Sequence, residues 1–549
     1  MDRTTPRPAT IALLAAACLA AVSCTGTEAP RGTIVIAPGA EPSTPVPTLI
    51  ASATDQEVAE LLFLRLGELD STGRTLGDSI FRPALARSWS RPDSLTLVFE
   101  LDPGARWQDG RPVTSSDVAF TFVRSRRVSP SLATALSQVD TVTTDGPERV
   151  VFHFRQAYGE QMYDAVWHLL ILPEHLVGPI PDDSLAESGF AAAPVGSGPY
   201  RFVRRTPGQT LELAANDSFF LGRPGLARVI YRTAGDADAR LNLLLSGGAD
   251  LVQWLGLNAA RRVEESPDLR VIPVPSSAVT YVLFNQKASG NRDRPNPILS
   301  DVRVRRALLL GLDREAMLRS VYDTFATIPP DAPVPQAFAW VAGPADRHAA
   351  RDTAQAQALL REAGWVDHDG DGILDRNGRK LELTIDLPGT NQQRRLLAQQ
   401  MQEQLGRLGV KINIQELDFT VFSQRRNAGQ FEMNFGFAVM DPSPTGIRNS
   451  WSCATAGRPF QNVGSYCNPA VDSLLALGQR TGEDRYYQQA IGRIQQDVPA
   501  IFLAAPFTLY GMSDRFAAHP FRIESQLLHL WQWSTRPGQE LPQDSAAGE

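Results

Sequence analysis

The sequence lacks a long apolar run outside its N-terminus, any basic block and the common hydrolase motifs. Its N-terminal apolar run, Ile11 to Val22, has 12 residues, whereas a helix that crosses a bilayer needs about 20. The net charge of −7 without a basic block argues against nucleic acid as the main partner. Neither G-x-S-x-G nor H-E-x-x-H occurs, and the seven histidines are scattered, so nothing marks an exported hydrolase.

Cysteine is also scarce: there are four in 549 residues, and two of them lie near the N-terminus. Cys453 and Cys467 remain for the folded protein. Two cysteines this close in an exported domain predict a disulfide, because such domains fold in an oxidising compartment. Two unpaired thiols are the alternative.

The N-terminus indicates export. Arg3 and Arg7 precede the apolar run, which ends in Ala21-Val22-Ser23-Cys24. A basic start, a short apolar core and small residues before the cleavage point are typical of a signal peptide, and the last four residues resemble a bacterial lipobox. We therefore expect residues 1–23 to be a signal peptide, Cys24 to carry a lipid and residues 24–32 to form a tether, so that the protein is anchored in the cell envelope and faces the periplasm or the outside. An ordinary secretory signal with an incidental cysteine is the alternative.

Hydrophobic periodicity predicts an α/β fold with added mixed β structure. Apolar residues alternate in Leu95–Leu101 and in Leu381–Leu387, which is the period of a strand. A helix is expected from about Asn391, followed by a second strand at Val410–Ile414. Strand, crossover helix and strand indicate a parallel pair.

Further elements are expected elsewhere in the chain. The apolar run Thr33–Ala37 predicts a buried first strand, and Val150–Phe154 predicts another strand. Thr114 and Asp117 have the spacing of a capping box, which predicts a helix start. One amphipathic helix is expected over Val302–Tyr322, capped by Ser300 or Asp301.

Six segments, in order, resemble the solute-binding proteins of peptide-type ABC importers, extracellular family 5. The first segment is Leu95–Val118, whose last twelve residues are WQDGRPVTSSDV. The second is PVGSGPYRF, residues 194–202. Each motif alone is weak, but together they cover nearly the whole chain after the N-terminal segment. The other four are Leu243–Leu251, Tyr281–Asn285, Asp301–Arg314 and Asn462–Leu474.

The resemblance implies a two-lobed periplasmic-binding-protein clamshell of type II, with an extra inserted subdomain. Hinge strands join the lobes, and closure encloses the ligand. The lobe boundaries expected on this basis are residues 33–60 with 190–285 and 500–535 for the first lobe, 61–189 for the inserted subdomain, 286–499 for the second lobe and 536–549 for a flexible tail.

The resemblance also implies an acidic residue that holds the terminal ammonium of a bound peptide. In this sequence Met440 falls where the acid is expected, and Asp441 comes one position later. A slip by one residue turns a strand side chain to the other face, although a loop absorbs it. Asp441 is therefore a candidate ligand contact, and the start of an Asp-Pro turn is the alternative.

Several other residues are candidates for the ligand site. Asn285 follows the apolar Tyr281–Phe284 and is expected either to point into the cleft or to bond nearby backbone. Tyr281 is also expected to contact the ligand in the cleft. Trp254, Trp451 and Tyr466 are expected to wall a pocket or to lie in the core, and Arg448 to bind a ligand carboxylate or to lie at the surface.

One acidic loop has the spacing of a calcium site. Oxygen ligands at loop positions 1, 3, 5 and 9 suit a hard cation, but Gly378 stands where a bidentate glutamate is expected. No cofactor is required, and structural calcium and a metal-free turn both remain open. The four acids are Asp367, Asp369, Asp371 and Asp375.

The sequence thus predicts a substrate-binding lipoprotein, not an enzyme, that delivers short peptides or a related small solute to an ABC permease of the inner membrane. The resemblance implies a monomer. Alternatives are a non-peptide cargo such as a metal chelate, opine or sugar, a partnership with a sensor, and an exported hydrolase.

Overall fold

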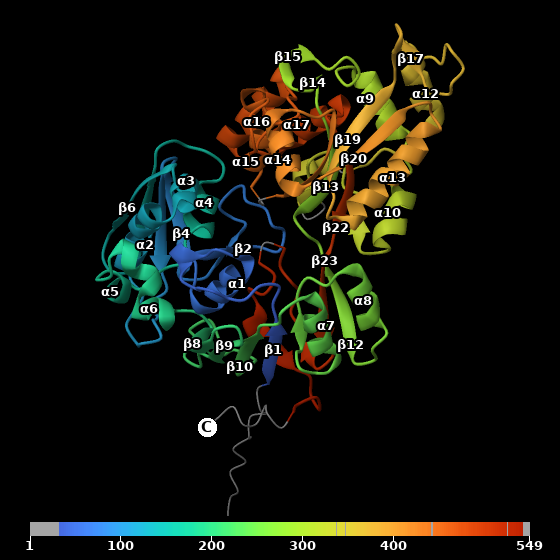
Figure 1. The fold of residues 1–549 in the computed structure, drawn as a ribbon. Helices are drawn as coiled ribbons and strands as arrows, with labels where there is room; N and C mark the ends of the chain where they lie inside the picture. The colour runs from blue at the N-terminus through green and yellow to red at the C-terminus, as the bar shows by residue number, and fades with distance from the viewer. Residues whose placement is uncertain (1–31, 336–337, 346, 441–442, 524, 542–549) are drawn as a thin grey trace, which may run out of the picture.

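The chain forms two lobes joined by extended segments. The computed structural model describes residues 32–335, 338–345, 347–440, 443–523 and 525–541. Each lobe is built on its own large sheet, one of seven strands and one of six, and the two bodies are distinct in Figure 1. Among the described residues, no helix has both the length and the apolar character to cross a membrane. The predicted two-lobed α/β architecture is confirmed.

The first strand of the chain lies within the seven-stranded sheet. β1 (Thr33–Ala37) pairs in parallel with β10 (Arg228–Arg232) and β11 (Leu251–Val252). Ile34 and Ile36 are fully buried, as expected for an apolar run in a parallel strand. The sheet order is β12 (Leu269–Val274), β23 (Thr508–Ser513), β11, β1, β10, β9 (Thr210–Ala215) and β8 (Tyr200–Thr206), and α7 (Ala237–Leu245) and α8 (Leu257–Glu264) pack against β11, β12 and β23.

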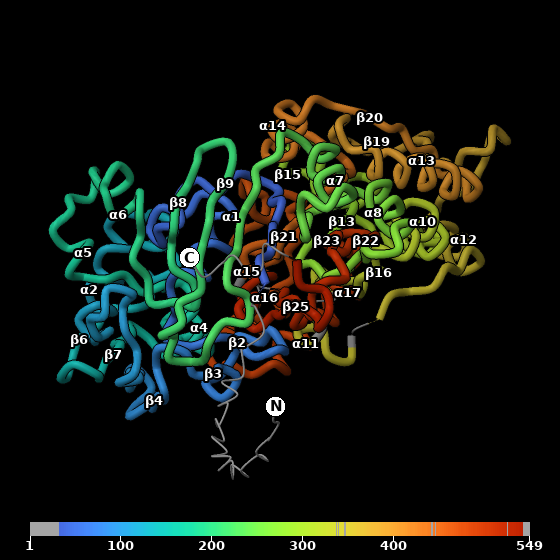
Figure 2. Tube along the Cα trace, turned by 90° about the horizontal axis from the view of Figure 1, so that it is seen from below, coloured from blue at the N-terminus to red at the C-terminus, as the bar shows by residue number. Residues whose placement is uncertain are grey.

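A four-stranded antiparallel sheet forms the centre of the inserted subdomain. Its order is β4 (Ala86–Asp93), β5 (Thr96–Leu101), β7 (Arg149–Phe154) and β6 (Val139–Thr144). Figure 2 shows this sheet at the left of the molecule and the large sheet of the second lobe to the right. The buried residues of the subdomain join the same apolar cluster as those of β1, so the insertion extends the core of the first lobe. The other elements are α1 (Ala53–Leu62), β2 (Gly67–Leu69), β3 (Phe81–Pro83), α2 (Ser115–Val128), α3 (Pro130–Ala135), α4 (Gln161–Trp167), α5 (Glu174–Val177) and α6 (Gly189–Ala192).

The turns at the start of α2 and before β8 have structural roles. The Thr114–Asp117 capping box is present at the start of α2. Gln108 accepts a hydrogen bond from the Gly196 N–H (3.1 Å) and donates one to the Tyr200 carbonyl (2.7 Å). A Cβ on Gly196 would lie 1.8 Å from the carbonyl oxygen of Leu62 at the end of α1. The glycine is therefore needed because backbone packs directly on backbone.

The second lobe contains the six-stranded sheet. Its order is β16 (Ala326–Thr327), β22 (Ala500–Pro506), β13 (Ala278–Phe284), β21 (Met433–Val439), β19 (Glu382–Pro388) and β20 (Lys411–Leu417). β19, α13 (Gln392–Gly406) and β20 form the predicted parallel unit. The remaining elements are β14 (Lys287–Ala288), β15 (Asn291–Pro295), α9 (Val302–Leu310), α10 (Arg314–Tyr322), α11 (Ala339–Ala342), α12 (Thr353–Glu362), β17 (Asp375–Arg376), β18 (Arg379–Lys380), α14 (Phe419–Ala428), α15 (Thr445–Trp451), α16 (Pro469–Thr481) and α17 (Asp484–Asp497). After the return to the first lobe come β24 (Phe516–Ala517) and β25 (Ser534–Thr535).

Two sequence expectations need correction. The single helix predicted over Val302–Tyr322 is two helices, because Asp313 accepts a hydrogen bond from the Ala316 N–H and starts α10 anew. The expected lobe boundaries are also wrong. The ranges 190–285 and 500–535 placed β13 and β22 in the first lobe, but these strands pair with each other in the second-lobe sheet. The chain therefore passes between the two large sheets at residues 275–277 and at Phe507.

The lobes also contact each other where the inserted subdomain meets α16 and α17. The Gly159 N–H donates to the Gln479 carbonyl (2.9 Å), and Arg74 forms an ion pair with Asp484. A Cβ on Gly159 would lie 2.3 Å from the Cα of Gly482. The first and second lobes therefore meet both at the crossover segments and at this backbone contact.

Candidate functional site

A cavity of about 430 Å³ opens in the second lobe beside the end of β21. Its walls are mainly apolar and aromatic, and Arg426 is the one charged side chain among its described lining residues. Phe460 protrudes into it from the loop between α15 and α16 and is 80% exposed. Strands β13, β21 and β22 supply the floor through Val279, Tyr281, Leu283, Phe437, Val439 and Phe502.

A second cavity of about 540 Å³ lies at the crossover between the lobes. Trp254 and Gln526 contribute from the first lobe, while Phe437 and Val439 contribute from β21. Because Phe437 and Val439 line both cavities, the two spaces adjoin at the end of β21, and together they are called the cleft; residues of both lobes line the crossover cavity. A concave site of this size, largely apolar and placed between domains, is typical of small-molecule binding.

The end of β21, which borders this cleft, has no partner strand on one side among the described residues. The Asn285 N–H bonds to the Glu432 carbonyl, and the Met440 N–H bonds to the Ser277 carbonyl, so the even-numbered residues of β21 face β13. Phe437 and Val439 therefore turn their N–H and C=O groups away from β13. On that side β19 pairs with β21 only at Met433 and Asn434, which leaves the edge beyond them without a described partner strand.

Tyr281 and Trp451 line the second-lobe cavity, and their contact with a ligand stays a prediction. Their rings pack on Phe502, with centroid distances of 6.0 Å in both cases. Gly436, opposite Tyr281 in the β13–β21 register, leaves room for the Tyr281 ring, since a Cβ there would lie 2.4 Å from it. Tyr466 is instead a core residue, buried and bonded to Asp497 (2.7 Å).

Trp254 lines the crossover cavity and is 40% exposed. Its backbone has a φ of 56°, which is uncommon for a residue with a bulky side chain. The ring lies on Gly39, where a Cβ would be 1.9 Å from the ring atom Cε3. The strained backbone and the glycine thus hold an aromatic surface at the edge of the cleft.

Asn285 and Arg448 do not line either cavity. Asn285 is buried, and its side-chain amide donates to the carbonyls of Gly429 (3.1 Å) and Phe431 (2.9 Å). The expectation that it points into the cleft is therefore wrong, because these backbone groups occupy its donors. Arg448 is exposed on α15 and bonds to Gln479. Asp441 and Cys24 lie outside the described residues.

Cys453 and Cys467 form the predicted disulfide. It closes the loop that carries Phe460, whose backbone also has a positive φ of 62°. The Phe460 N–H donates to the Asn427 side chain (3.0 Å) at the end of α14. These restraints fix an exposed aromatic side chain at the cavity wall.

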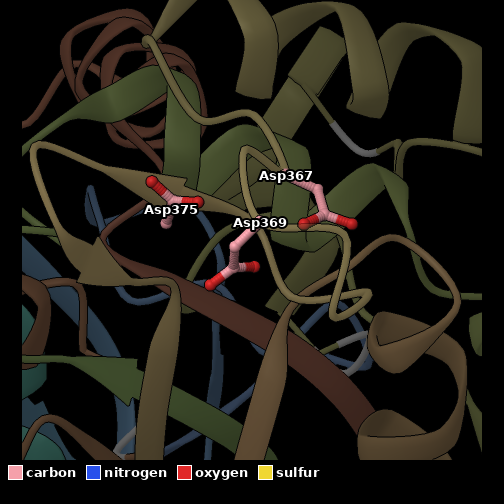
Figure 3. A group of neighbouring side chains, drawn as sticks. All are labelled: Asp367, Asp369 and Asp375. Carbon is pink, nitrogen blue, oxygen red and sulfur yellow. The ribbon is translucent and has the colours of Figure 1, made fainter.

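Three acids of the predicted calcium loop lie close together: potential ligand atoms of Asp367, Asp369 and Asp375 lie within 4.8 Å of one another (Figure 3). Asp371 lies in the same loop, and the Lys380 ammonium is 2.9 Å from its carboxylate. Lys380 also contacts Asp369 (2.5 Å). Calcium binding here remains a prediction, and a lysine already neutralises two of the carboxylates.

Residues that the motifs did not indicate complete the cleft. Arg426, Phe460 and Phe502 line it, and Arg394 lies over the Phe437 ring, 5.3 Å from its centroid. Burial lowers the pKa of the Arg394 guanidinium. The two adjacent arginines of α14 are visible in the sequence as a pair of positive charges that could have indicated a polar site. Only the fold shows that Arg425 pairs with Asp386 and that Arg426 lines the cleft.

Comparisons with known proteins agree with this architecture. The chain is 26% identical over 506 residues to the oligopeptide-binding protein AppA of Bacillus subtilis, with 89% of each chain covered. It is 26% identical over 518 residues to Protein XP55 of Streptomyces lividans, covering 91% of this chain and 88% of that protein.

Solved structures share the fold over 92% of this chain. The structure of B. subtilis AppA in complex with a nonapeptide has a TM-score of 0.66 at 24% identity and is covered over 99% of its length. NikZ from Campylobacter jejuni in complex with Ni(L-His) has a TM-score of 0.69 at 21% identity and is covered completely. The profile described as "Bacterial extracellular solute-binding proteins, family 5 Middle" matches residues 81–458. This chain therefore belongs to the family 5 bacterial extracellular solute-binding proteins.

Proposed function

We propose that this chain captures a short peptide, or a related small solute, in the cleft between its lobes and presents it to the permease of an ABC importer. The observation that carries the proposal is the edge of β21 at Phe437 and Val439, which has no partner strand on the side away from β13 among the described residues and borders an aromatic-walled cleft. An extended ligand can add to such an edge through main-chain hydrogen bonds, which accept many sequences.

The walls of the cleft support the same proposal. Cavities of about 430 and 540 Å³ lie beside the edge, and each has room for ligand side chains or for an apolar body. Aromatic side chains such as Tyr281, Trp451 and Phe460 provide apolar area with few rotatable bonds. Main-chain pairing would fix the ligand, and the neighbouring spaces would admit varied side chains.

Capture requires that the lobes move apart and close again. Chain segments 275–277 and Phe507 cross between the sheets and are the places where a hinge rotation is absorbed. Closure excludes water from the ligand, and the joined surfaces of both lobes then form a face that a permease can distinguish from the open form.

A lipid on Cys24 would hold the protein at the membrane that contains its permease. The proposal rests on the signal-like N-terminus and on Ala21-Val22-Ser23-Cys24. Expression of the full chain with a labelled fatty acid should give a labelled, membrane-associated product, and Cys24→Ala should give an unlabelled one. Equal labelling of both would contradict lipidation at Cys24.

The β21 edge can be tested with one backbone substitution. Val439→Pro removes an N–H that points away from β13, so the sheet is retained while a donor to the ligand is lost. We expect this variant to bind a peptide mixture about tenfold more weakly than wild type, the size of one hydrogen bond in an enclosed site. Val439→Ala is the control for the side chain. Equal peptide binding by both variants in calorimetry, with unchanged unfolding, would contradict pairing at this edge.

A non-peptide cargo is the second candidate. None of the described residues that line the two cavities is acidic, so none of them offers a carboxylate to the free amino terminus of a peptide. Asp441, which lies outside the described residues, is the candidate for that role. NikZ, which shares the fold, holds Ni(L-His). Mass measurement of co-purified ligand distinguishes a peptide mixture from a single chelate, opine or sugar.

A further inference from the structure

The inserted subdomain places one apolar side chain in the core of the second lobe. Leu76, in the loop between β2 and β3, is 5% exposed and belongs to an apolar cluster with Phe338, Ile447 and Tyr487. Among the described residues, every other buried member of this cluster lies between positions 279 and 502, within the second lobe. Leu76 therefore crosses the boundary between the lobes.

The loop that carries Leu76 is fixed within its own subdomain. The buried Thr75 hydroxyl donates a hydrogen bond to the Glu160 carboxylate (3.1 Å). The Gly77 N–H donates to the Gly159 carbonyl (3.3 Å). Because both bonds stay within the inserted subdomain, the loop does not depend on the second lobe for its shape.

Two glycines face each other across the same boundary. A Cβ on Gly159 would lie 2.3 Å from the Cα of Gly482, and a Cβ on Gly482 would lie 2.9 Å from the Cα of Gly159. The Gly159 N–H also donates to the carbonyl of Gln479 (2.9 Å), in the last turn of α16, where a helix leaves its carbonyls without internal donors. Backbone therefore packs on backbone at this contact, which requires glycine.

A charged pair lies at the rim of this contact. Arg74 forms an ion pair with Asp484 at the start of α17, and it lies over the Trp340 ring, 5.3 Å from the ring centroid. The Arg74 side chain is 36% exposed and that of Asp484 is 20% exposed. Exposed ion pairs contribute little, so the buried Leu76 and the glycine pair dominate the contact.

The contact shares its core with the second-lobe cavity. The cluster that receives Leu76 also contains Tyr281, Trp451 and Phe502, which line that cavity. Leu76 itself is not among the described lining residues of either cavity. Figure 1 shows β2 and α16 apart from β13 and β23, which border the crossovers. Leu76 can therefore act on a ligand only through the relative position of the lobes.

We propose that the inserted subdomain is a latch, formed by Leu76 and the Gly159–Gly482 contact, which holds the lobes closed even without a ligand and so sets how fast a ligand enters and leaves. Opening exposes Leu76 to water, and burial of one leucine shifts an equilibrium by about 10- to 100-fold. Leu76 is thus a positioning residue. The effect on ligand exchange rests on the proposed function, whereas the effect on lobe closure does not.

Small-angle X-ray scattering of the chain from Thr25 onward tests closure without a ligand. Bound material is first removed by unfolding in urea and refolding with the disulfide intact. Gly159→Ala adds a methyl group against Gly482, and its backbone needs no left-handed φ. We expect Gly159→Ala and Leu76→Ala to have a larger radius of gyration than wild type, and Leu76→Met to scatter as wild type. Gly189→Ala, in the same subdomain with open space around it, is the matched control.

Exchange of a tetrapeptide mixture, followed by stopped-flow tryptophan fluorescence, tests the effect on the ligand. We expect association and dissociation both to be about tenfold faster in Leu76→Ala and Gly159→Ala, because the ligand enters and leaves through the open form. The affinity should change less than either rate. Damage to the binding site would instead slow association. Urea midpoints of all variants establish that they are folded.

The outcomes separate the two proposals. If the ligand-free wild type and both folded latch variants scatter alike, the latch is overturned, and unchanged exchange rates in both variants would overturn it as well. If the variants open in scattering but no protein binds the peptide mixture, the latch is supported as a closure device, and the proposed peptide-type cargo is overturned.

Discussion

Glu57 on α1 is a buried carboxyl group whose protonation should make the stability of the protein depend on pH. One oxygen accepts a hydrogen bond from the Gln253 amide (2.7 Å), and Oε1 has no hydrogen-bond partner among the described residues. Burial, together with the nearby charge of Glu60, raises the pKa of Glu57 from 4.5 to about 8. The folded protein therefore holds this group neutral at pH 7, whereas the unfolded chain ionises it.

The sign of the effect follows from proton linkage. The pKa is raised in the folded state, so stability from this group is fully present below pH 4.5 and is lost as the pH rises through about 8. Between pH 5 and pH 7 the loss is about 2–3 kcal/mol, because the unfolded carboxyl releases its proton and the folded one retains it. Over the whole range the loss approaches about 5 kcal/mol.

Glu57→Gln removes the titration and keeps the shape of the side chain. Urea unfolding at pH 5, 6, 7 and 8, followed by tryptophan fluorescence, should show a flatter pH dependence for the variant than for wild type. The variant should also be more stable than wild type at pH 7, by up to about 3 kcal/mol. Glu403→Gln, on the exposed face of α13, is the matched control. Parallel pH profiles for wild type and Glu57→Gln would refute the reasoning.

Three further perturbations test other parts of the fold. Reducing the disulfide, or replacing Cys453 and Cys467 by serine, should lower the free energy of unfolding by about 3 kcal/mol; unchanged urea midpoints would contradict a stabilising role for this cross-link. Gly196→Ala should destabilise the first lobe by more than 2 kcal/mol, roughly the scale of strong overpacking, while Gly189→Ala, which has open space around it, should change the thermal midpoint little; equal effects would refute the close approach to α1. Lys380→Met should enlarge the thermal shift at millimolar calcium relative to wild type, because the lysine neutralises two acids of the loop; the absence of a shift in both proteins would contradict calcium binding there.

Local patterns predicted much of the fold. The alternation in Leu381–Leu387 and the apolar stripe of the following helix are set by residues a few positions apart, and the β19–α13–β20 unit forms as expected. The capping box at Thr114 is also local. Such signals are strong because strand and helix periods appear directly in the sequence.

What the sequence could not predict depends on distant partners. The sheet that β13 joins is decided by its pairing with β21 and β22, whose paired residues are 149 or more positions away in the chain, and no alternation pattern encodes that choice. Asn285 is satisfied by the carbonyls of Gly429 and Phe431, which only the fold brings near. The same holds for Arg426, whose role differs from that of Arg425 because Asp386 is within reach of one and not of the other.

Native mass spectrometry of the gently purified chain from Thr25 onward tests the central claim most directly. The account predicts that the folded protein retains a heterogeneous set of peptide-sized ligands, that denaturation releases them, and that Val439→Pro lowers their occupancy. A single non-peptide species would reassign the cargo. An empty protein that also shows no thermal shift across a peptide library would contradict the account.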